Sequence, residues 1–97
     1  MIYEIVSLTV VDPDLREEFI EVYKKAWNEA AFEGSHKGTL MRAMENPSRV
    51  DVIIEWDSLE AHRQHRGSPK QNAFRAAFAK YRKDAEVEHF EFEELVP

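Results

Sequence analysis

The order of extended and helical segments constrains the fold of this chain most. Four segments are rich in β-branched and aromatic residues, which favours β-strands. They lie at about residues 1–10, 39–44, 50–56 and 85–96. Between the first two strands, and again between the last two, apolar residues recur every three or four positions, as they do in amphipathic helices. The sequence therefore predicts the order β-α-β-β-α-β.

Capping residues set the expected helix boundaries. Asp12 and Pro13 are typical of a helix start, and the first helix should end near residue 34. The second helical unit begins at about residue 57 and is interrupted at Gly67, after which Ser68 and Pro69 start a further helix. The buried stripe expected for that last helix consists of Phe74, Ala77, Phe78 and Tyr81.

Two split β-α-β units place both helices on one face of the sheet. The predicted fold is thus an α+β, ferredoxin-like βαββαβ sandwich with a four-stranded antiparallel sheet, and 97 residues suit a single domain, 1–97. The strands carry apolar side chains on both faces, with Val6 and Leu8 on one face of the first strand and Ile5 on the other. Because the helices cover one face only, we expect a homodimer in which two sheets pack together.

Composition excludes several classes of function. A formal net charge of −6 disfavours nucleic-acid binding, which depends on neutralising phosphates. The absence of cysteine removes disulfides, thiolate metal sites and cysteine nucleophiles. No apolar run approaches about 18 residues and the N-terminus lacks the pattern of a signal peptide. We therefore expect a soluble, cytoplasmic protein without a nucleic-acid or membrane partner.

Four histidines raise the question of a metal site. His62 and His65 are three residues apart on a predicted helix and could face one ion, with His36 or His89 as a third ligand. No established metal-binding spacing supports this, and surface or half-buried histidines are the favoured interpretation. Glycine-rich phosphate loops and a serine nucleophile elbow are also missing. We expect no metal and no organic cofactor.

Trp56 is the strongest candidate for a binding residue. It ends a strand whose alternate residues Val52 and Ile54 share its face, so its indole should lie between the sheet and the helices. There it would give an aromatic ligand a flat wall. Trp27 and Arg42 are further possible walls. The alternative is that Trp56 is simply a large core residue.

The histidines could also serve as acids or bases. His62 or His65 could exchange a proton with a ligand near neutral pH, because an unperturbed histidine has a pKa near 6.5. Helical geometry favours one of them pointing fully inward. His89, on the last strand, could face either layer of the sandwich. A purely structural role remains the alternative for each of the three.

One stretch resembles a known family. In "EWDSLEAHRQHRGSP", the matching residues are Glu55, Trp56, Ser58, Glu60, Ala61, His65, Ser68 and Pro69. Phe74, Phe78, the turn "ENPSR" and the late strand "VEHFE" match as well. Together these spacings resemble the signature of the antibiotic biosynthesis monooxygenase family, over nearly the whole chain.

The resemblance implies a dimeric α+β barrel with a cavity between sheet and helices in each subunit. Some members oxidise phenols or quinols with molecular oxygen and without metal, flavin or nicotinamide. Such chemistry needs a base and a dry, apolar cavity. By resemblance, His65 or His62 is the expected base, and the residues expected to bind the substrate are Trp56, Val52, Phe74, Trp27 and His89.

Some positions depart from the family pattern. Lys70 stands where a histidine is frequent, and Val52 where polyketide-oxidising members carry a polar amide. His65 and Arg75 replace residues typical of haem-degrading relatives, so haem degradation is disfavoured. Two other functions stay open: a non-catalytic, dimeric small-molecule-binding or stress-related protein, and a non-oxidative isomerase or lyase.

Overall fold

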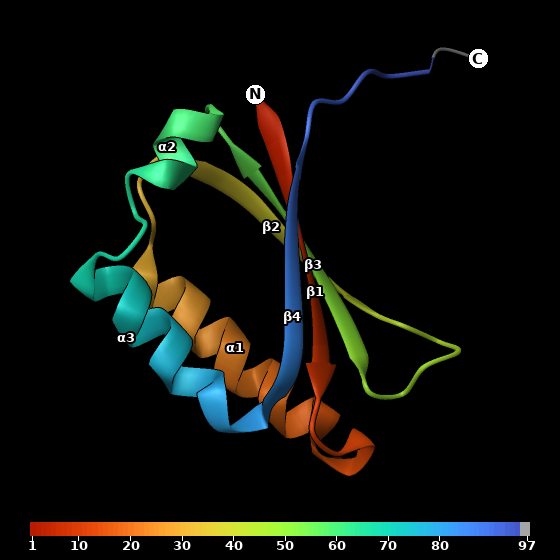
Figure 1. Cartoon of the computed structure of the whole chain (residues 1–97). Helices are drawn as coiled ribbons and strands as arrows, with labels where there is room; N and C mark the ends of the chain where they lie inside the picture. Colours follow the sequence, from red (N-terminus) through yellow and green to blue (C-terminus); the bar gives the residue numbers. More distant parts are fainter. Residues whose placement is uncertain (96–97) are drawn as a thin grey trace.

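The computed structural model describes residues 1–95, which form a four-stranded antiparallel sheet with its helices on one face (Figure 1). The elements in chain order are β1 (Ile2–Val10), a 3-10 turn (Pro13–Leu15), α1 (Arg16–Ala30), β2 (Ser35–Arg42), β3 (Arg49–Trp56), α2 (Leu59–Arg63), α3 (Pro69–Phe78), a second 3-10 turn (Ala79–Tyr81) and β4 (Arg82–Phe90). The strand order in the sheet is β2-β3-β1-β4. The predicted α+β, ferredoxin-like fold is confirmed.

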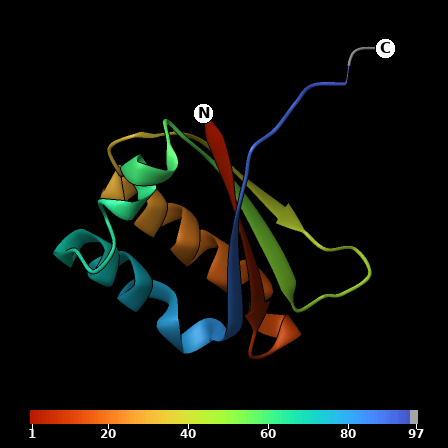
Figure 2. The same cartoon turned by 45° about the horizontal axis from the view of Figure 1, so that its top comes forward.

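The core lies between the sheet and the helices. Alternate residues of the two central strands point inward, so that Val6 of β1 lies opposite Val52 of β3 and is 9% exposed. Figure 2 shows α1 and α3 lying side by side across this face. Their aromatic side chains interlock, as in the edge-on contact of Phe19 with Phe78 at 5.8 Å between ring centroids. This layer separates the sheet from solvent.

Serines start the second and third α-helices, and the cap at Ser68 was predicted. Ser58 caps α2 by accepting a hydrogen bond from the amide of Ala61 at 3.1 Å. Ser68 caps α3 in the same way through the amide of Gln71, also at 3.1 Å. Between them Gly67 has φ 71°, a left-handed conformation that glycine adopts without strain. The two caps turn the chain so that α2 lies apart from α3.

The chain between α1 and β2 differs from the prediction. The helix ends at Ala30 instead of near residue 34, because Ala31 adopts a left-handed conformation with φ 43°. Strand β2 then begins at Ser35, four residues before the predicted start. Gly34 lies in the turn with φ 86°, and a Cβ atom there would approach the Cβ of Ala61 to 2.9 Å. This turn therefore packs closely against α2.

The last strand is also displaced from its predicted range. It begins at Arg82 and ends at Phe90, where its final partner is Tyr3 of β1. Only Ile2 of β1 lies beyond this pair, so the strand ends close to the edge of its partner. Residues 91–95 have no regular structure, and the predicted end at residue 96 lies outside the described residues. On α3, Ala77 is exposed and not part of the buried stripe.

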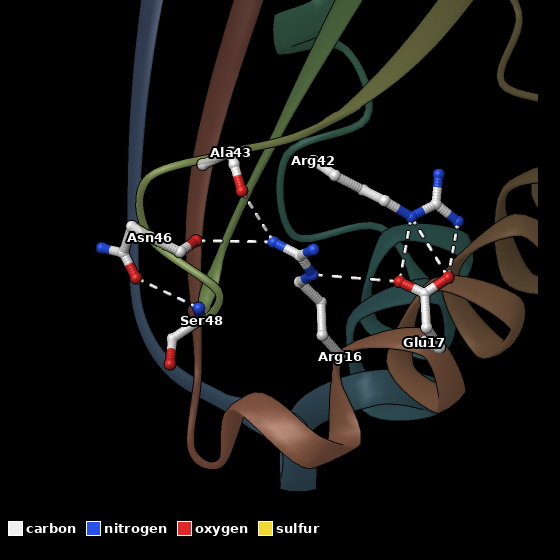
Figure 3. Close-up of polar contacts among 6 residues, drawn as sticks. All are labelled: Arg16, Glu17, Arg42, Ala43, Asn46 and Ser48. Atoms are coloured by element: carbon white, nitrogen blue, oxygen red, sulfur yellow. Dashed lines mark hydrogen bonds and ion pairs between the residues drawn. The ribbon is translucent and has the colours of Figure 1, made fainter.

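The β2–β3 hairpin is tied to the start of α1 (Figure 3). A guanidinium nitrogen of Arg16 donates to the carbonyl oxygen of Ala43 at 2.9 Å and to that of Asn46 at 3.4 Å. Arg42 makes a two-pronged ion pair with Glu17, with nitrogen–oxygen distances of 2.8 and 2.9 Å. Arg42 is thus engaged at the surface. It does not line the cavity described below, contrary to the expectation for this residue.

Two surface properties bear on partners. The sheet face opposite the helices carries apolar side chains that no described helix or strand covers, on Ile5, Met41, Ile53 and Phe90. Tyr3 lies on the same face, where the ring of Phe92 stacks on it at 4.3 Å between centroids. Among residues 1–95, no helix is long and apolar enough to cross a membrane.

Candidate functional site

A cavity of about 220 Å³ lies between the sheet and the helices. Aromatic side chains form most of its apolar wall: Tyr23, Trp27, Phe32, Trp56, Phe74 and Phe78. Its polar lining consists of Glu4, His62, His65, Gln71, Arg75 and Arg82. The cavity is therefore an aromatic chamber with several ionisable groups in its wall.

Trp56 is both a core residue and a wall of the cavity. Its side chain is 2% exposed, and its indole Nε1 donates a hydrogen bond of 2.9 Å to Oε1 of Glu4. The indole stacks on the imidazole of His62, with ring centroids 4.7 Å apart and planes 22° apart. These contacts lock the indole in one orientation, so Trp56 gives the cavity a rigid wall.

Glu4 is a buried carboxylate that the sequence reasoning missed. It lies on the inward face of β1, is 6% exposed and lines the cavity. Burial raises the pKa of Glu4, while the hydrogen bond from Trp56 and the positive charge of Arg75 act in the opposite direction. A signal was present, because Glu4 shares the inward register of the apolar residues Val6 and Leu8. A charged residue at such a position is a functional candidate.

His62 connects Glu4 with His89. Its Nε2 lies 3.5 Å from Oε1 of Glu4, and its Nδ1 lies 2.7 Å from Nε2 of His89. Burial, followed by the neighbouring positive charges and histidines, lowers the pKa of His62 to about 4. His62 is therefore neutral at pH 7. Both of its ring nitrogens face a polar partner.

His89 faces the helical layer, which settles the side left open by the sequence. On β4 it lies opposite Glu4 of β1 in the strand register. Burial, together with the charges of Arg63 and Arg66, lowers the pKa of His89. It contacts His62 but is not part of the cavity lining itself.

His65 lines the cavity as well, so both histidines of the helical segment reach it. Its Nε2 lies 2.8 Å from the carbonyl oxygen of Glu33. Since a carbonyl oxygen can only accept, Nε2 carries the hydrogen and Nδ1 is the basic nitrogen of the neutral ring. Phe32 and Trp56 flank the imidazole, with centroid distances of 5.0 and 5.7 Å. The ring is thus held with one nitrogen uncommitted.

The remaining predicted residues divide into two groups. Trp27 and Phe74 line the cavity, whereas Val52 is buried in the core at 3% exposure and is not part of the wall. His36 pairs with Asp57 at the surface and also lies outside the cavity wall. Among the described residues, no group of three or more histidine, aspartate or glutamate side chains is arranged to hold a metal ion.

Two wall residues with hydrogen-bonding groups, the aromatic Tyr23 and the polar Gln71, gave no signal in the sequence. Tyr23 belongs to the apolar stripe of α1, yet it lines the cavity, and burial followed by the charge of Glu4 raises the pKa of its hydroxyl. It therefore remains a neutral donor. Gln71 is 9% exposed, and its Oε1 accepts from the amide of Gly67 at 2.9 Å, which leaves its amide nitrogen as a donor. Neither role can be inferred from helical spacing alone.

Known proteins share this architecture. A candidate antibiotic biosynthesis monooxygenase from Bordetella bronchiseptica superposes with a TM-score of 0.87 at 23% identity, over 96% of this chain and 97% of its own. SnoaB, a cofactor-independent oxygenase from Streptomyces nogalater, gives 0.81 at 20% identity, over 99% and 96%. A conserved protein from Methanosarcina mazei gives 0.75 at 20% identity, over 96% and 94%. No curated protein sequence matched the chain.

The structural likeness at these identities concerns the fold. The family model for antibiotic biosynthesis monooxygenases, however, matches residues 1–90, which is nearly the whole sequence. The resemblance noted in the segment around Trp56 is therefore confirmed, and the chain belongs to the antibiotic biosynthesis monooxygenase family.

Proposed function

We propose that this protein oxidises a small aromatic, phenolic or quinol compound with molecular oxygen and without a cofactor. The observation that carries the proposal is the aromatic chamber with two histidines and a buried carboxylate in its wall. Family membership and the likeness to SnoaB, described as a cofactor-independent oxygenase, support the same chemistry. A substrate that is itself electron-rich can supply the electrons that a flavin or metal supplies elsewhere.

The chemistry balances when the substrate supplies all four electrons. A hydroquinone reacts with one molecule of oxygen to give a hydroxyquinone and one molecule of water. One oxygen atom enters the ring and the other leaves as water, so no external reductant is needed. The protein must remove a proton to form the electron-rich anion, orient the ring and exclude water.

His65 is the proposed base of this reaction. Its Nδ1 is the basic nitrogen of the ring, while Nε2 is occupied by the carbonyl of Glu33. His62 is less suited to contact the substrate directly, because its nitrogens already face Glu4 and His89. In this arrangement His62 supports the acid–base chemistry from within the wall, through Glu4.

The aromatic wall selects the shape and size of the substrate. Trp56, Phe74 and Trp27 offer ring faces and edges to a planar ligand. At about 220 Å³ the cavity is smaller than most ligand pockets, which hold roughly 300–1,000 Å³. We therefore propose one- or two-ring substrates instead of the larger polycyclic compounds.

Oxygen consumption tests the proposal. A panel of hydroquinones and naphthohydroquinones, with three-ring anthrones as oversized comparisons, is added to wild-type protein and to His65→Ala, and oxygen uptake is followed with an oxygen electrode. The expected result is enzyme-dependent uptake of one oxygen molecule per substrate, reduced by about two to four orders of magnitude in the variant. Equal, background-level uptake by both proteins at every pH would refute the proposal. Tight binding without any uptake would instead favour a small-molecule-binding protein.

We further propose that the protein is a homodimer joined through its sheets. The sheet face opposite the helices presents Ile5 and Ile53 to solvent, flanked by Met41 and Phe90, each 40% exposed. A second copy would bury this face, and a chain of 97 residues gains needed apolar burial from association. Sedimentation velocity at micromolar concentration measures the mass, and a monomer would exclude this dimer. Ile53→Lys should dissociate it.

A further inference from the structure

Three ionisable side chains from three different elements follow one another from the cavity toward the sheet edge. Glu4 comes from the central strand β1, His62 from α2, and His89 from β4, the edge strand. The successive separations are 3.5 Å from Glu4 Oε1 to His62 Nε2 and 2.7 Å from His62 Nδ1 to His89 Nε2. Nothing in the proposed role of His65 requires this line.

The two carboxylate oxygens of Glu4 have different surroundings. Oε1 accepts from the Trp56 indole and faces His62. Among the described residues, none forms a hydrogen bond with Oε2. Every fully buried side-chain oxygen or nitrogen of the described residues does have a hydrogen-bond partner. Oε2 is therefore not fully buried, and because Glu4 lines the cavity we assign Oε2 to the cavity side. A ligand hydroxyl in the cavity can therefore reach an uncommitted carboxylate oxygen.

From this geometry we propose that Glu4 is a further catalytic residue, which takes a proton from the hydroxyl of a bound phenol and exchanges it with solvent through His62 and His89. The inference rests on the proposed function, because it assumes an aromatic ligand with an acidic hydroxyl. It adds a second acid–base group to the one assigned to His65.

The proton balance follows from the two tautomers of the histidine pair. The O–H bond of the phenol breaks and an O–H bond forms on Oε2 of Glu4, leaving a phenolate. A half-turn of the carboxyl group then exchanges its two oxygens, so that the protonated oxygen faces Nε2 of His62. When both rings carry hydrogen on Nδ1, Glu4 passes its proton to Nε2 of His62, whose Nδ1 hydrogen moves to Nε2 of His89. His89 then releases its own Nδ1 hydrogen to solvent. Both rings end with hydrogen on Nε2, and the reverse passage delivers one proton inward.

The charges around Glu4, His62 and His89 affect how strongly each of these groups binds a proton. The positive charge of Arg75 of α3 acts on Glu4, and the charge of Glu4 in turn acts on the hydroxyl of Tyr23 of α1. Both residues line the cavity where the phenolate would form. His65, Arg66 and Arg75 contribute to the lowered pKa of His62. Arg63 and Arg66 contribute to the lowered pKa of His89. These positive groups disfavour an imidazolium, so both histidines stay neutral and relay a proton without storing it.

A chromogenic phenol tests the acceptor without requiring any oxidation. 4-Nitrophenol is bound in weakly buffered solution at a pH about one unit below its own pKa, and both the phenolate absorbance of the bound fraction and the protons released to the solution are measured. Wild type should form bound phenolate while releasing few protons, because Glu4 beside the phenolate retains the phenol proton. Glu4→Gln keeps an oxygen for the Trp56 indole but cannot take a proton, so each phenolate formed should release about one proton to the solution. The control Glu29→Gln, on the exposed face of α1, removes the same charge outside the cavity and should match wild type. The same number of protons released per bound phenolate in wild type and in Glu4→Gln would overturn the proposal.

A second measurement needs no ligand, so the failure of each proposal can be recognised separately. Carbon-13 NMR follows the titration of the Glu4 carboxyl in the free protein, in wild type, His62→Gln and His89→Gln. The hydrogen that Nε2 of a neutral His62 can donate to Oε1 of Glu4 favours the carboxylate. Its loss predicts an upward shift of the Glu4 midpoint by about half a pH unit or more in His62→Gln, and a smaller shift in His89→Gln. Midpoints identical in all three proteins would overturn the relay even if 4-nitrophenol binds. Shifted midpoints without any binding of 4-nitrophenol would leave the relay standing and refute the phenolic substrate.

Discussion

Replacing His62 should remove a large part of the acid sensitivity of this protein. Burial in the wall of the cavity lowers the pKa of His62 from 6.5 to about 4, and its side chain is 16% exposed. Above pH 6.5, the pKa of His62 in the unfolded chain, the full contribution of this group to folded-state stability is present. As the pH falls from 6.5 toward 4, the unfolded chain binds a proton at His62 while the folded protein does not, so this contribution is lost. A shift of one pKa unit corresponds to about 1.4 kcal/mol, so the loss by pH 4 amounts to about 3 kcal/mol.

Urea unfolding between pH 7 and pH 4 measures this contribution. The free energy of unfolding of wild type should fall by about 3 kcal/mol more over this range than that of His62→Gln. Taking the difference between the two proteins cancels the groups that titrate alike in both. The pKa of His89 is depressed in the same sense, so part of the effect belongs to the pair, and His89→Gln should show a share of it.

The control for this experiment is His36→Gln, which removes a histidine paired with Asp57 outside the cavity. Its stability should follow wild type across the whole pH range to within about 0.5 kcal/mol. If the gap between wild type and His62→Gln is the same at pH 7 and at pH 4, the histidine is not held neutral by its surroundings, and the reasoning fails.

Three further substitutions test the architecture that holds the cavity. Trp56→Phe should lower the free energy of unfolding by about 2–4 kcal/mol, because it empties part of the core and removes the indole that donates to Glu4 at 2.9 Å. Chemical denaturation measures this loss, and a value under about 1 kcal/mol would contradict the buried hydrogen bond. Gly34→Ala should lower the free energy of unfolding by about 1–3 kcal/mol, because φ is 86° and the new methyl group would lie 2.9 Å from the Cβ of Ala61. An unchanged melting temperature would argue against this turn. Ser68→Ala should cost about 1 kcal/mol through loss of the α3 cap, and Ser68→Asp should restore most of it.

The fold was largely predictable because it depends on local patterns. Alternating apolar residues around Val6 and Val52, and the caps at Ser58 and Ser68, act over a few residues and can be recognised in the sequence. The boundaries that were wrong depend on contacts between segments. Strand β4 runs from Arg82, opposite Val10 of β1, to Phe90, opposite Tyr3, and no local pattern in residues 85–96 reveals this pairing.

The candidate site was predictable only in its aromatic members and histidines. Trp56 and Phe74 were expected in the wall and line it, while Val52 was also expected there but lies within the core. A side chain on the inward face of a strand can meet either packed neighbours or an empty space, and the sequence does not distinguish these. The position of the helix above the strand decides between them.

The sequence alone determined the order of strands and helices, the inward face of each central strand and the family to which the chain belongs. Only the tertiary structure brought Glu4, His62 and His89 into one line, since they are far apart along the chain. The physical reason is one of range. Periodicity and capping act between neighbours in sequence, whereas the proton affinity of a buried group depends on the side chains that folding places around it.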